Sequence, residues 1–324
     1  MIISKTPLRI SFVGGGSDFK DYYQRDYGAV VSTAINKYIY ITVNKRFDDL
    51  IRVSYSKTEL VDNVDNLKHD IIREALKLTG VTQGVEVVYI SDLPLRNTGL
   101  GSSSSLAVGV LNALYAYKNK KVGVKRLAEE ACKIEIEILK RPIGKQDQYA
   151  AAFGGLNYIR FNKDESVEVK PIIFNKDLFH KFNRIFLIFY TGRVVKSGRI
   201  LVEQKDKTSK NFSVLDEMVK FTKDFYWNLK KGKLDVVGDL LHRNWLHKQK
   251  LASQITNKTI DVYYEKAIKA GAAGGKILGS GGGGFLLLCC KPDDKFKIRK
   301  ELLNLKEMPF KLETQGSEII YKSN

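Results

Sequence analysis

The hydrophobic residues of the chain are spaced in two different ways, and the spacing changes along the sequence. Four early runs mix β-branched and aromatic residues and end in turn-forming residues, which is typical of strands. They are residues 8–13, 38–43, 51–53 and 85–90. Helical spacing follows at residues 102–117, where Leu106, Val110 and Leu114 stand at i, i+4 and i+8 and predict one core-facing stripe.

The next elements are also helical. A second helix is predicted over residues 124–139, before Arg141 and Pro142, and a short third helix near Gln146. Strands are then expected before Phe174 and at residues 184–190.

The rest of the chain predicts a second α+β half. Residues 212–270 are mostly helical, and KILGSGGGGFLLLCC is typical of strand, glycine loop and strand. A helix from Asp293 and a strand at 318–321 are expected to complete this half. No repeat or linker marks a boundary. We place it near residues 175–183, which gives an α+β protein with domains 1–180 and 181–324.

The composition is that of a globular protein except for its charge. Of 324 residues, 44% are hydrophobic and 28% are charged, which excludes a disordered chain. The formal charge of +18 fits three partners: nucleic acid, an anionic membrane or a phosphorylated small substrate. Lysine and arginine are spread along the chain with no RNA-binding aromatic signature or zinc-finger spacing, so a basic nucleic-acid-binding protein stays as the second class.

Other features bear on the compartment. The longest apolar run, residues 285–290, is too short to span a bilayer, and MIISKTPLRISFVGG has no signal-peptide core. Cys132, Cys289 and Cys290 suit neither a disulfide framework nor a metal knuckle. We therefore expect a cytoplasmic protein with no membrane partner, and the oligomeric state stays open, a homo-oligomer included.

The segment DLPLRNTGLGSSSSLAVGVLNAL, residues 92–114, predicts an anion site. Gly99 and Gly101 remove Cβ atoms, so backbone amides can approach a bulky ligand. Ser102, Ser103 and Ser104 then stand at a helix N-terminus, where free N–H groups and the helix dipole favour negative charge. Phosphate is the expected anion, and an ordinary capped helix is the alternative.

Three further clusters carry candidate chemistry. TPLRISFVGGGSDF holds Arg9 before three glycines and Asp18, RPIGKQDQYAAAFGG holds Asp147, and GSGGGG spans residues 279–284. Glycine loops beside strands allow backbone to come within hydrogen-bonding distance of a charged ligand. A polyphosphate would bring Mg²⁺, for which a serine hydroxyl and one carboxylate are expected ligands. Glu135 or Glu137 would supply the carboxylate, and at most one of them, because residues two apart on a helix point to different faces.

Two other motifs are near misses. GAAGGKIL has Lys276 after Gly275, but it lacks the Gly and Ser/Thr of a Walker A loop. His242 and His247 of HRNWLH stand five residues apart and diverge on a helix, so two histidines without a metal are the preferred interpretation.

The order of PLRISFVGGGSDF, LPLRNTGLGSSSS, GKQDQ and GSGGGG resembles the small-molecule kinase superfamily of galactokinase, homoserine kinase, mevalonate kinase and phosphomevalonate kinase. Within it, VGGGSDF, EIEILKRPIGKQDQYAAAFGGLNYI and FYTG most resemble the heptose 7-phosphate kinases, with fucokinase-type enzymes next. The resemblance implies a first domain like domain 2 of ribosomal protein S5, a ferredoxin-like second domain and a site between them.

The resemblance also implies roles for particular residues. Residues 99–104 would hold the phosphates of ATP, and Ser103 with Glu135 would ligate Mg²⁺. Asp147 would be the catalytic aspartate, with Arg9 facing it, and Asp18 would bind sugar hydroxyls. The fourth cluster, through Gly281 and Gly282, is expected at the substrate.

One departure from the superfamily bears on the acceptor. Galactokinases carry Glu-His where this chain has Gly15 and Gly16, which opens space for a larger or phosphorylated sugar, unless the loop merely turns. In GRVVKSGR, Arg193, Lys196 and Arg199 stand at three-residue steps and would share a face if the segment is helical. Such a face would bind the acceptor's phosphate, and a solvated basic surface is the alternative.

The expected function is therefore that of an ATP-dependent sugar kinase. The resemblance implies D-glycero-D-manno-heptose 7-phosphate as the acceptor, with transfer to the anomeric O1 to give the 1,7-bisphosphate for nucleotide-activated heptose. A fucokinase-like or other sugar 1-kinase is the alternative. The expected partners are ATP, Mg²⁺ and a sugar phosphate, without nucleic acid.

Overall fold

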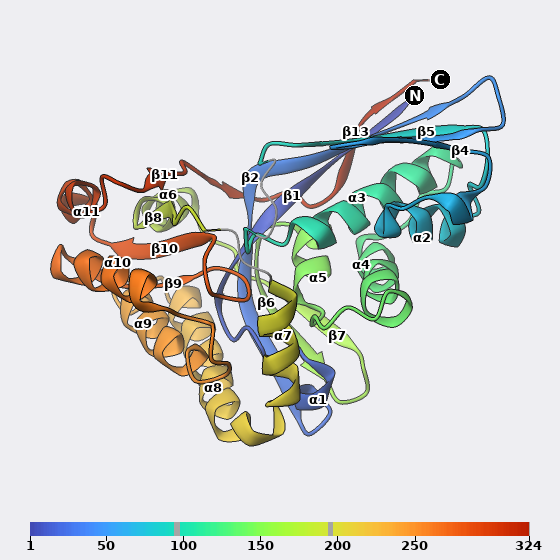
Figure 1. Cartoon of the computed structure of the whole chain (residues 1–324). Helices are drawn as coiled ribbons and strands as arrows, with labels where there is room; N and C mark the ends of the chain where they lie inside the picture. The colour runs from blue at the N-terminus through green and yellow to red at the C-terminus, as the bar shows by residue number, and fades with distance from the viewer. Residues whose placement is uncertain (94–97, 194–196, 324) are drawn as a thin grey trace.

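A computed structural model describes residues 1–93, 98–193 and 197–323 of the chain (Figure 1). Within these residues, strands from both ends of the chain form a nine-stranded sheet in the order β13-β1-β2-β5-β3-β4, with β12 and β6 also on β2 and β7 on β6. Its strands are β1 (Ile2–Val13), β2 (Tyr27–Lys45), β3 (Ile51–Ser54), β4 (Thr58–Val61), β5 (Val85–Ser91), β6 (Leu156–Asn162), β7 (Val167–Pro171), β12 (Leu312–Glu313) and β13 (Glu318–Lys322).

Helices cover one face of this sheet, as Figure 1 shows. They are α2 (Asp70–Thr79), α3 (Ser102–Tyr117), α4 (Val124–Cys132) and α5 (Gln146–Phe153), while the short α1 (Lys20–Tyr23) follows the glycine loop after β1. Helix α3 packs directly on β1 and β2 and is buried along most of its length. Its bounds match the predicted helix because the apolar stripe and the glycine before it mark both the buried face and the start.

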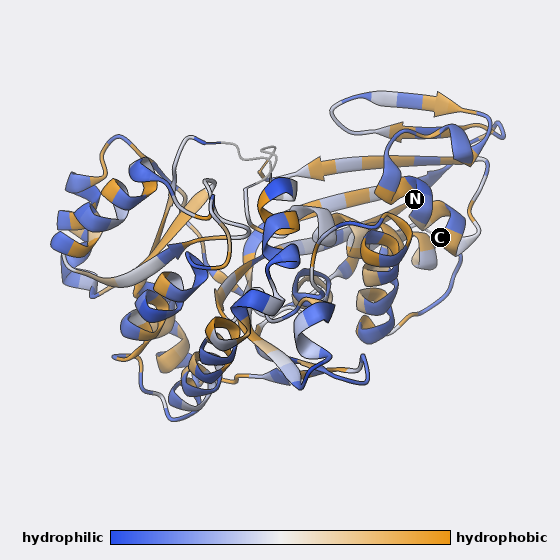
Figure 2. Cartoon of the chain, turned by 60° about the horizontal axis from the view of Figure 1, so that its bottom comes forward, coloured by the Kyte–Doolittle hydropathy of each residue, from blue (hydrophilic) through white to orange (hydrophobic). Residues whose placement is uncertain are grey.

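The second sheet has the order β11-β8-β10-β9 and is antiparallel throughout. Its strands are β8 (Phe186–Tyr190), β9 (Ala272–Ile277), β10 (Phe285–Cys290) and β11 (Lys306–Glu307). The helices of this half are α6 (Lys176–Arg184), α7 (Ser197–Asp206), α8 (Phe212–Lys230), α9 (Val237–Lys248), α10 (Lys258–Lys269) and α11 (Lys295–Glu301). In Figure 2 most helices carry both hydrophilic and hydrophobic residues, as expected for elements that face a core on one side and solvent on the other.

A hydrophobic cluster includes residues of both halves. Phe12 of β1 is fully buried, and its ring lies 5.7 Å from Phe182 of α6, 5.2 Å from Phe186 of β8 and 5.6 Å from Phe225 of α8, between ring centroids. Aromatic pairs at these distances add to the free energy of burial. The strand that carries Arg9 is thereby fixed against the second half of the molecule.

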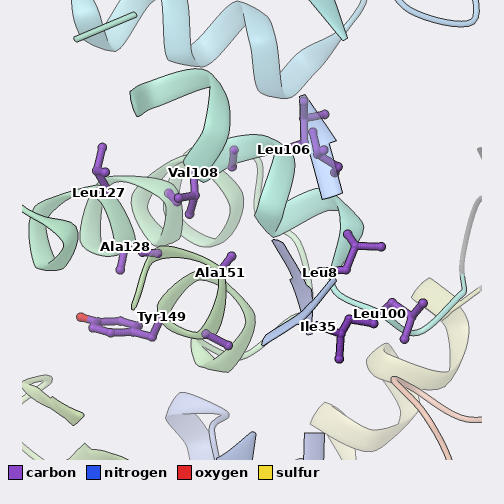
Figure 3. Packing of buried hydrophobic residues seen from close by; sticks show 14 of the residues in the cluster. Leu8, Ile35, Leu100, Leu106, Val108, Leu127, Ala128, Tyr149 and Ala151 are labelled. Carbon is purple, nitrogen blue, oxygen red and sulfur yellow. The ribbon is translucent and has the colours of Figure 1, made fainter. Parts of the chain in front are cut away.

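A second region of this core lies at the start of α3. Figure 3 shows Leu8, Ile35 and Leu100 close together, and all three are fully buried. Leu8 of β1 is registered against Ile35 of β2, and the Arg9 amide donates to the carbonyl of Leu100 at 3.0 Å. The loop before α3 is therefore attached to the strand that carries Arg9.

Three features differ from the expectations. The helix predicted over residues 124–139 is α-helical only to Cys132 and continues as a π-helical turn, Lys133–Ile138. Helix α6 occupies the predicted boundary region, with Asn175 capping its first turn. The strand expected to complete the second half, β13, instead pairs with β1, and β12 pairs with β2. Residues 181–324, the predicted second domain, therefore contain the whole second sheet and also β12 and β13, which belong to the first sheet.

The described residues include no helix that is both long and apolar enough to cross a membrane. All three cysteines are buried and free.

Gly28 of β2 offers a test of the close packing between β2 and the glycine loop after β1. A Cβ on Gly28 would overlap the carbonyl oxygen of Ser17, a backbone atom that cannot rotate away. Gly28→Ala should therefore lower the free energy of unfolding by about 1–3 kcal/mol, measured by urea denaturation. Gly198→Ala is the control, because an added Cβ in helix α7 meets nothing within 4 Å there, and it should not lower stability, since alanine suits a helix better than glycine. Equal effects would contradict the close packing of the loop on β2.

Candidate active site

A cavity of about 340 Å³ lies where the two halves meet. Its walls come from β1 and the glycine loop after it, the start of α3, the start of α5, helix α7, the end of α9 and the loop between β9 and β10. Figure 1 shows α7 and the β9–β10 loop between the two sheets. Most of the sequence-predicted site residues line it: Arg9, Gly15, Gly16, Asp18, Gly99, Gly101, Ser102, Ser103, Asp147 and Gly281.

Arg9 and Asp147 form a bidentate ion pair in the wall of this cavity. The Nε and Nη2 atoms of Arg9 donate to Oδ1 and Oδ2 of Asp147, each at 2.6 Å, and Nη1 donates to the carbonyl of Gly99, also at 2.6 Å. The arginine side chain is 4% exposed and the aspartate side chain 24%. Planar two-point contacts of this kind fix orientation as well as charge. The carboxylate is thus held in one position while one side of it stays open to the cavity.

Asp18 lies near this pair and is almost completely buried. Its Oδ1 accepts from the Gly16 amide and from Gln146 Nε2, both at 3.0 Å, and its Oδ2 accepts from the Gln146 amide at 3.3 Å. Burial raises the pKa of Asp18, and the charge of Asp147 adds to this, while the donated hydrogen bonds oppose it. A Cβ on Gly144 would overlap the Asp18 carboxylate, so this position requires glycine.

A second carboxylate, that of Glu135 on the π-helical turn, lies beside the first turn of α3. Glu135 is fully buried; its Oε2 accepts from Ser104 Oγ at 2.6 Å and Gln148 Nε2 at 2.7 Å, and its Oε1 from Arg141 Nη1 at 3.0 Å. Burial raises the pKa of Glu135, and hydrogen bonds from Ser104 and Ser103 and the charge of Arg141 act against this. Of the two glutamates left open by the sequence, Glu135 is the one beside the serines.

Ser103 and Glu137 have different surroundings. Ser103 is exposed and lines the cavity. Glu137, two residues after Glu135, is exposed on the other side of the π-helical turn, as the two-residue spacing predicts.

Two glycine loops that line the cavity contact each other, the loop before α3 and the loop between β9 and β10. Gly99 has φ of +79°, and a Cβ there would overlap the carbonyl of Leu278; Gly279 has φ of +72°, and its Cβ would overlap the Cα of Gly99. Both the left-handed backbone and the close contact require glycine. Gly281 and Gly283 line the cavity beyond this contact, whereas the Gly282 amide points away and donates to the Ile255 carbonyl at 2.7 Å.

Arg193 does not line the cavity, and Lys196 lies outside the described residues. The Arg193 side chain is exposed, with Nη1 at 3.4 Å from Asn257 Oδ1. Helix α7 begins at Ser197, so Arg193 precedes it and does not share a helical face with Arg199. The role of Arg193 and Lys196 stays a sequence-based prediction.

The structure brings residues to the site that the sequence did not single out. Lys248, at the end of α9, is 5% exposed and its Nζ donates to the Gly279 carbonyl at 2.6 Å. Burial lowers the pKa of Lys248 to about 8, with Arg9 adding to the effect and Asp18 opposing it. Gln204 of α7, Gln146 and Ser11 also line the cavity. A lysine in the last turn of a helix is usually explained by the helix dipole, so no sequence pattern marked Lys248.

Lys276 is buried close behind the cavity. It is 1% exposed, and its Nζ donates to the carbonyls of Ser11 at 2.8 Å and Phe12 at 3.2 Å. Burial lowers the pKa of Lys276 well below the usual value for lysine, and the charge of Lys248 adds to this. The near-miss Walker A lysine therefore supports the backbone of β1.

Comparison with known proteins identifies the family of the chain. The family descriptions "GHMP kinases N terminal domain" and "GHMP kinases C terminal" match residues 55–155 and 225–305. The chain is 28% identical to the D-glycero-alpha-D-manno-heptose 7-phosphate kinase of Campylobacter jejuni over 93% of both chains, and 26% identical to the galactokinase of Pyrococcus furiosus over 86% of both. It superposes on a D-glycero-D-manno-heptose 1-phosphate kinase from Bacteroides thetaiotaomicron over the whole of both chains, with a TM-score of 0.84 and 24% identity.

The fold and the matches define an ATP-dependent phosphotransferase with a mixed α/β, two-domain structure. The chain belongs to the GHMP kinase superfamily, and the resemblance noted in its sequence is confirmed.

Ser104 offers a test of the buried carboxylate site that does not depend on activity. Ser104→Ala removes a donor from the fully buried Glu135 carboxylate, which should cost about 1–3 kcal/mol of unfolding free energy. Ser102→Ala, in the same turn but half-buried, should cost less than about 0.5 kcal/mol. Chemical denaturation of both variants measures the difference. A Ser104→Ala protein as stable as the Ser102 control would show that Glu135 does not need this donor.

Proposed function

We propose that this kinase transfers the γ-phosphoryl group of ATP to the anomeric hydroxyl of a sugar phosphate, D-glycero-D-manno-heptose 7-phosphate. The bidentate Arg9–Asp147 pair carries the proposal, because it places an oriented carboxylate between the Asp18 side of the cavity and the start of α3. The choice of sugar rests on the relative named as a heptose 7-phosphate kinase, which matches along nearly the whole chain.

Asp147 would orient the acceptor hydroxyl and accept its proton. Phosphoryl transfer depends mainly on positioning and on neutralising charge on the transferred group. Arg9 fixes both oxygens of Asp147 and brings a positive charge to the same place. A carboxylate positioned as a general base contributes roughly 10²- to 10⁴-fold to rate.

ATP would lie with its phosphates at Gly99, Gly101 and Ser102–Ser104, where a helix N-terminus follows two glycines of left-handed conformation. The residues present fit Mg²⁺: Ser103 lines the cavity, and the Glu135 carboxylate accepts a hydrogen bond from the next residue, Ser104, so both Ser103 and Glu135 offer hard oxygen atoms. When bound, Mg²⁺ would neutralise and orient the phosphates.

The acceptor would lie on the Asp18 side. The Asp18 carboxylate can accept from sugar hydroxyls, and Gly15 and Gly16 line the cavity beside it. We keep Gly281 and Gly282 as predicted contacts to substrate, and Arg193 with Lys196 as the predicted binding residues for the acceptor's phosphate. The galactokinase relative supports a second candidate, a kinase for the anomeric hydroxyl of a neutral sugar.

A panel of acceptors tests the proposed substrate. ADP release should be measured with heptose 7-phosphate, sedoheptulose 7-phosphate, mannose, fucose and galactose, and the product identified by phosphorus NMR. The highest kcat/KM is expected for heptose 7-phosphate, with a new anomeric phosphate. A higher kcat/KM with fucose or galactose would favour the second candidate, and turnover of none of these sugars would overturn both.

A double-mutant cycle tests the Arg9–Asp147 pair. Asp147→Asn and Arg9→Gln should each lower kcat by about 10²- to 10⁴-fold, and the double variant should be little worse than either, because the two groups act as one unit. Turnover at saturating substrates measures the effect, with thermal melting to confirm folding. Asp21→Asn changes an exposed carboxylate of α1 and is the control. Losses that simply multiply would contradict a joint role.

A further inference from the structure

Lys248 is a buried ammonium that the proposed roles leave unused. It lies at the end of α9, outside the superfamily motifs, and lines the same cavity as Arg9 and Asp147. The one hydrogen-bond acceptor found for it in the described part of the chain is the Gly279 carbonyl. Burying a charged amine is costly unless its donors are used, and an ammonium has three.

Polar groups converge on a small space above Gly15. A Cβ built on Gly15 would lie 3.6 Å from Gln146 Nε2 and 3.7 Å from both Lys248 Nζ and Ser11 Oγ. These are ordinary contact distances, so the space is about the size of a small substituent. We call it the Gly15 niche, made by Ser11, Gln146 and Lys248 over Gly15.

Several polar atoms at the niche and beside it lack a partner. Ser11 Oγ, Gln146 Oε1 and the nearby Gln204 Oε1 are buried with no hydrogen-bond partner among the described residues. Such atoms are rare in folded proteins, and each normally finds protein or water. Thr98 Oγ1, from another residue of the cavity wall, also lacks a partner, and four such atoms around one cavity indicate that a polar ligand completes their hydrogen bonds.

The niche adjoins the acceptor side of the cavity. Gln146 is shared: its Nε2 donates to Asp18, and its neighbour in sequence is Asp147. The Asp18 carboxylate beside the niche disfavours a phosphate dianion there, since like charges repel at short range. Neutral hydroxyl groups fit this mixture of an ammonium, a hydroxyl, an amide and a carboxylate.

We propose that Lys248, with Ser11 and Gln146, binds hydroxyl groups of the acceptor sugar in the Gly15 niche. This inference rests on the proposed function. Lys248 is then an acceptor-binding residue contributed by the second half of the molecule to a site whose proposed catalytic pair comes from the first.

Lys248→Met tests the assignment. The KM for acceptor should rise about tenfold or more, because a hydrogen bond from a charged donor is lost. The KM for ATP should change less than about twofold. The fold-increase in acceptor KM should be the same for heptose 7-phosphate and for any neutral sugar that the enzyme phosphorylates, because both kinds of acceptor carry the hydroxyl groups that Lys248 would bind. Lys250→Met, two residues further and exposed, is the matched control.

A second variant keeps the test independent of the buried lysine. Gly15→Ala adds a methyl group at ordinary contact distances, so it should fold and melt like wild type while filling the niche. The acceptor KM should rise again, with the ATP KM unchanged. Gly123→Ala serves as its control.

The pH dependence of the acceptor KM gives a second test, because a lysine with a purely structural role would not change it. Four charged groups surround Lys248: Asp18, Asp147 of α5, Arg9 of β1 and Lys276 of β9. Burial lowers the pKa of Lys248 to about 8, so the wild-type acceptor KM should rise above that pH as the ammonium is lost. Lys248→Met should not show this rise.

The outcomes separate the two proposals. An unchanged acceptor KM in both Lys248→Met and Gly15→Ala, or a wild-type acceptor KM that is flat above about pH 8, would overturn the role of Lys248 alone. An effect confined to phosphorylated acceptors would replace the hydroxyl assignment by a phosphate site. A wild-type protein that binds ATP but phosphorylates no sugar would overturn the proposed function, and this assignment with it.

Discussion

The contact between Gly99 and Gly279 is the constraint around which the candidate site is built. The two residues belong to loops from different halves of the molecule, and neither position has room for a Cβ. Their carbonyl groups then hold the two cations of the cavity, Arg9 on Gly99 and Lys248 on Gly279, each at 2.6 Å. A side chain at either glycine would separate the loops and move both cations, so the site depends on a backbone contact more than on any single functional group.

The charges at the cavity are balanced locally. Among the described lining residues, the cations are Arg9 and Lys248 and the anions are Asp18 and Asp147. The chain's charge of +18 is therefore not concentrated there. Burial strengthens each of these interactions, because the effective dielectric constant is lower than in water. Burial acts on the pKa values of Asp18 and Lys248 in the expected opposite directions.

Rigid surroundings keep these groups in place. Phe12, three residues after Arg9, lies among aromatic rings of α6, β8 and α8, so the strand is fixed against the second half. At the other end of the same strand, β13 pairs with residues 2–5 and ties the end of the chain to its beginning. The halves are thus joined by core packing and by strand pairing as well as by the glycine contact.

The sequence by itself determined many of the helices and strands and the residues whose identity is dictated locally. The bounds of α3 follow from its apolar stripe and the glycine before it, and the choice of Arg9, Asp18, Asp147 and the glycine loops follows from motifs that need particular residue types. The tertiary structure alone decided which distant segments meet. No sequence pattern marked Lys248, and β13 was expected as the last strand of the second half. Burial and strand pairing depend on contacts between residues far apart in the chain, which local periodicity does not encode.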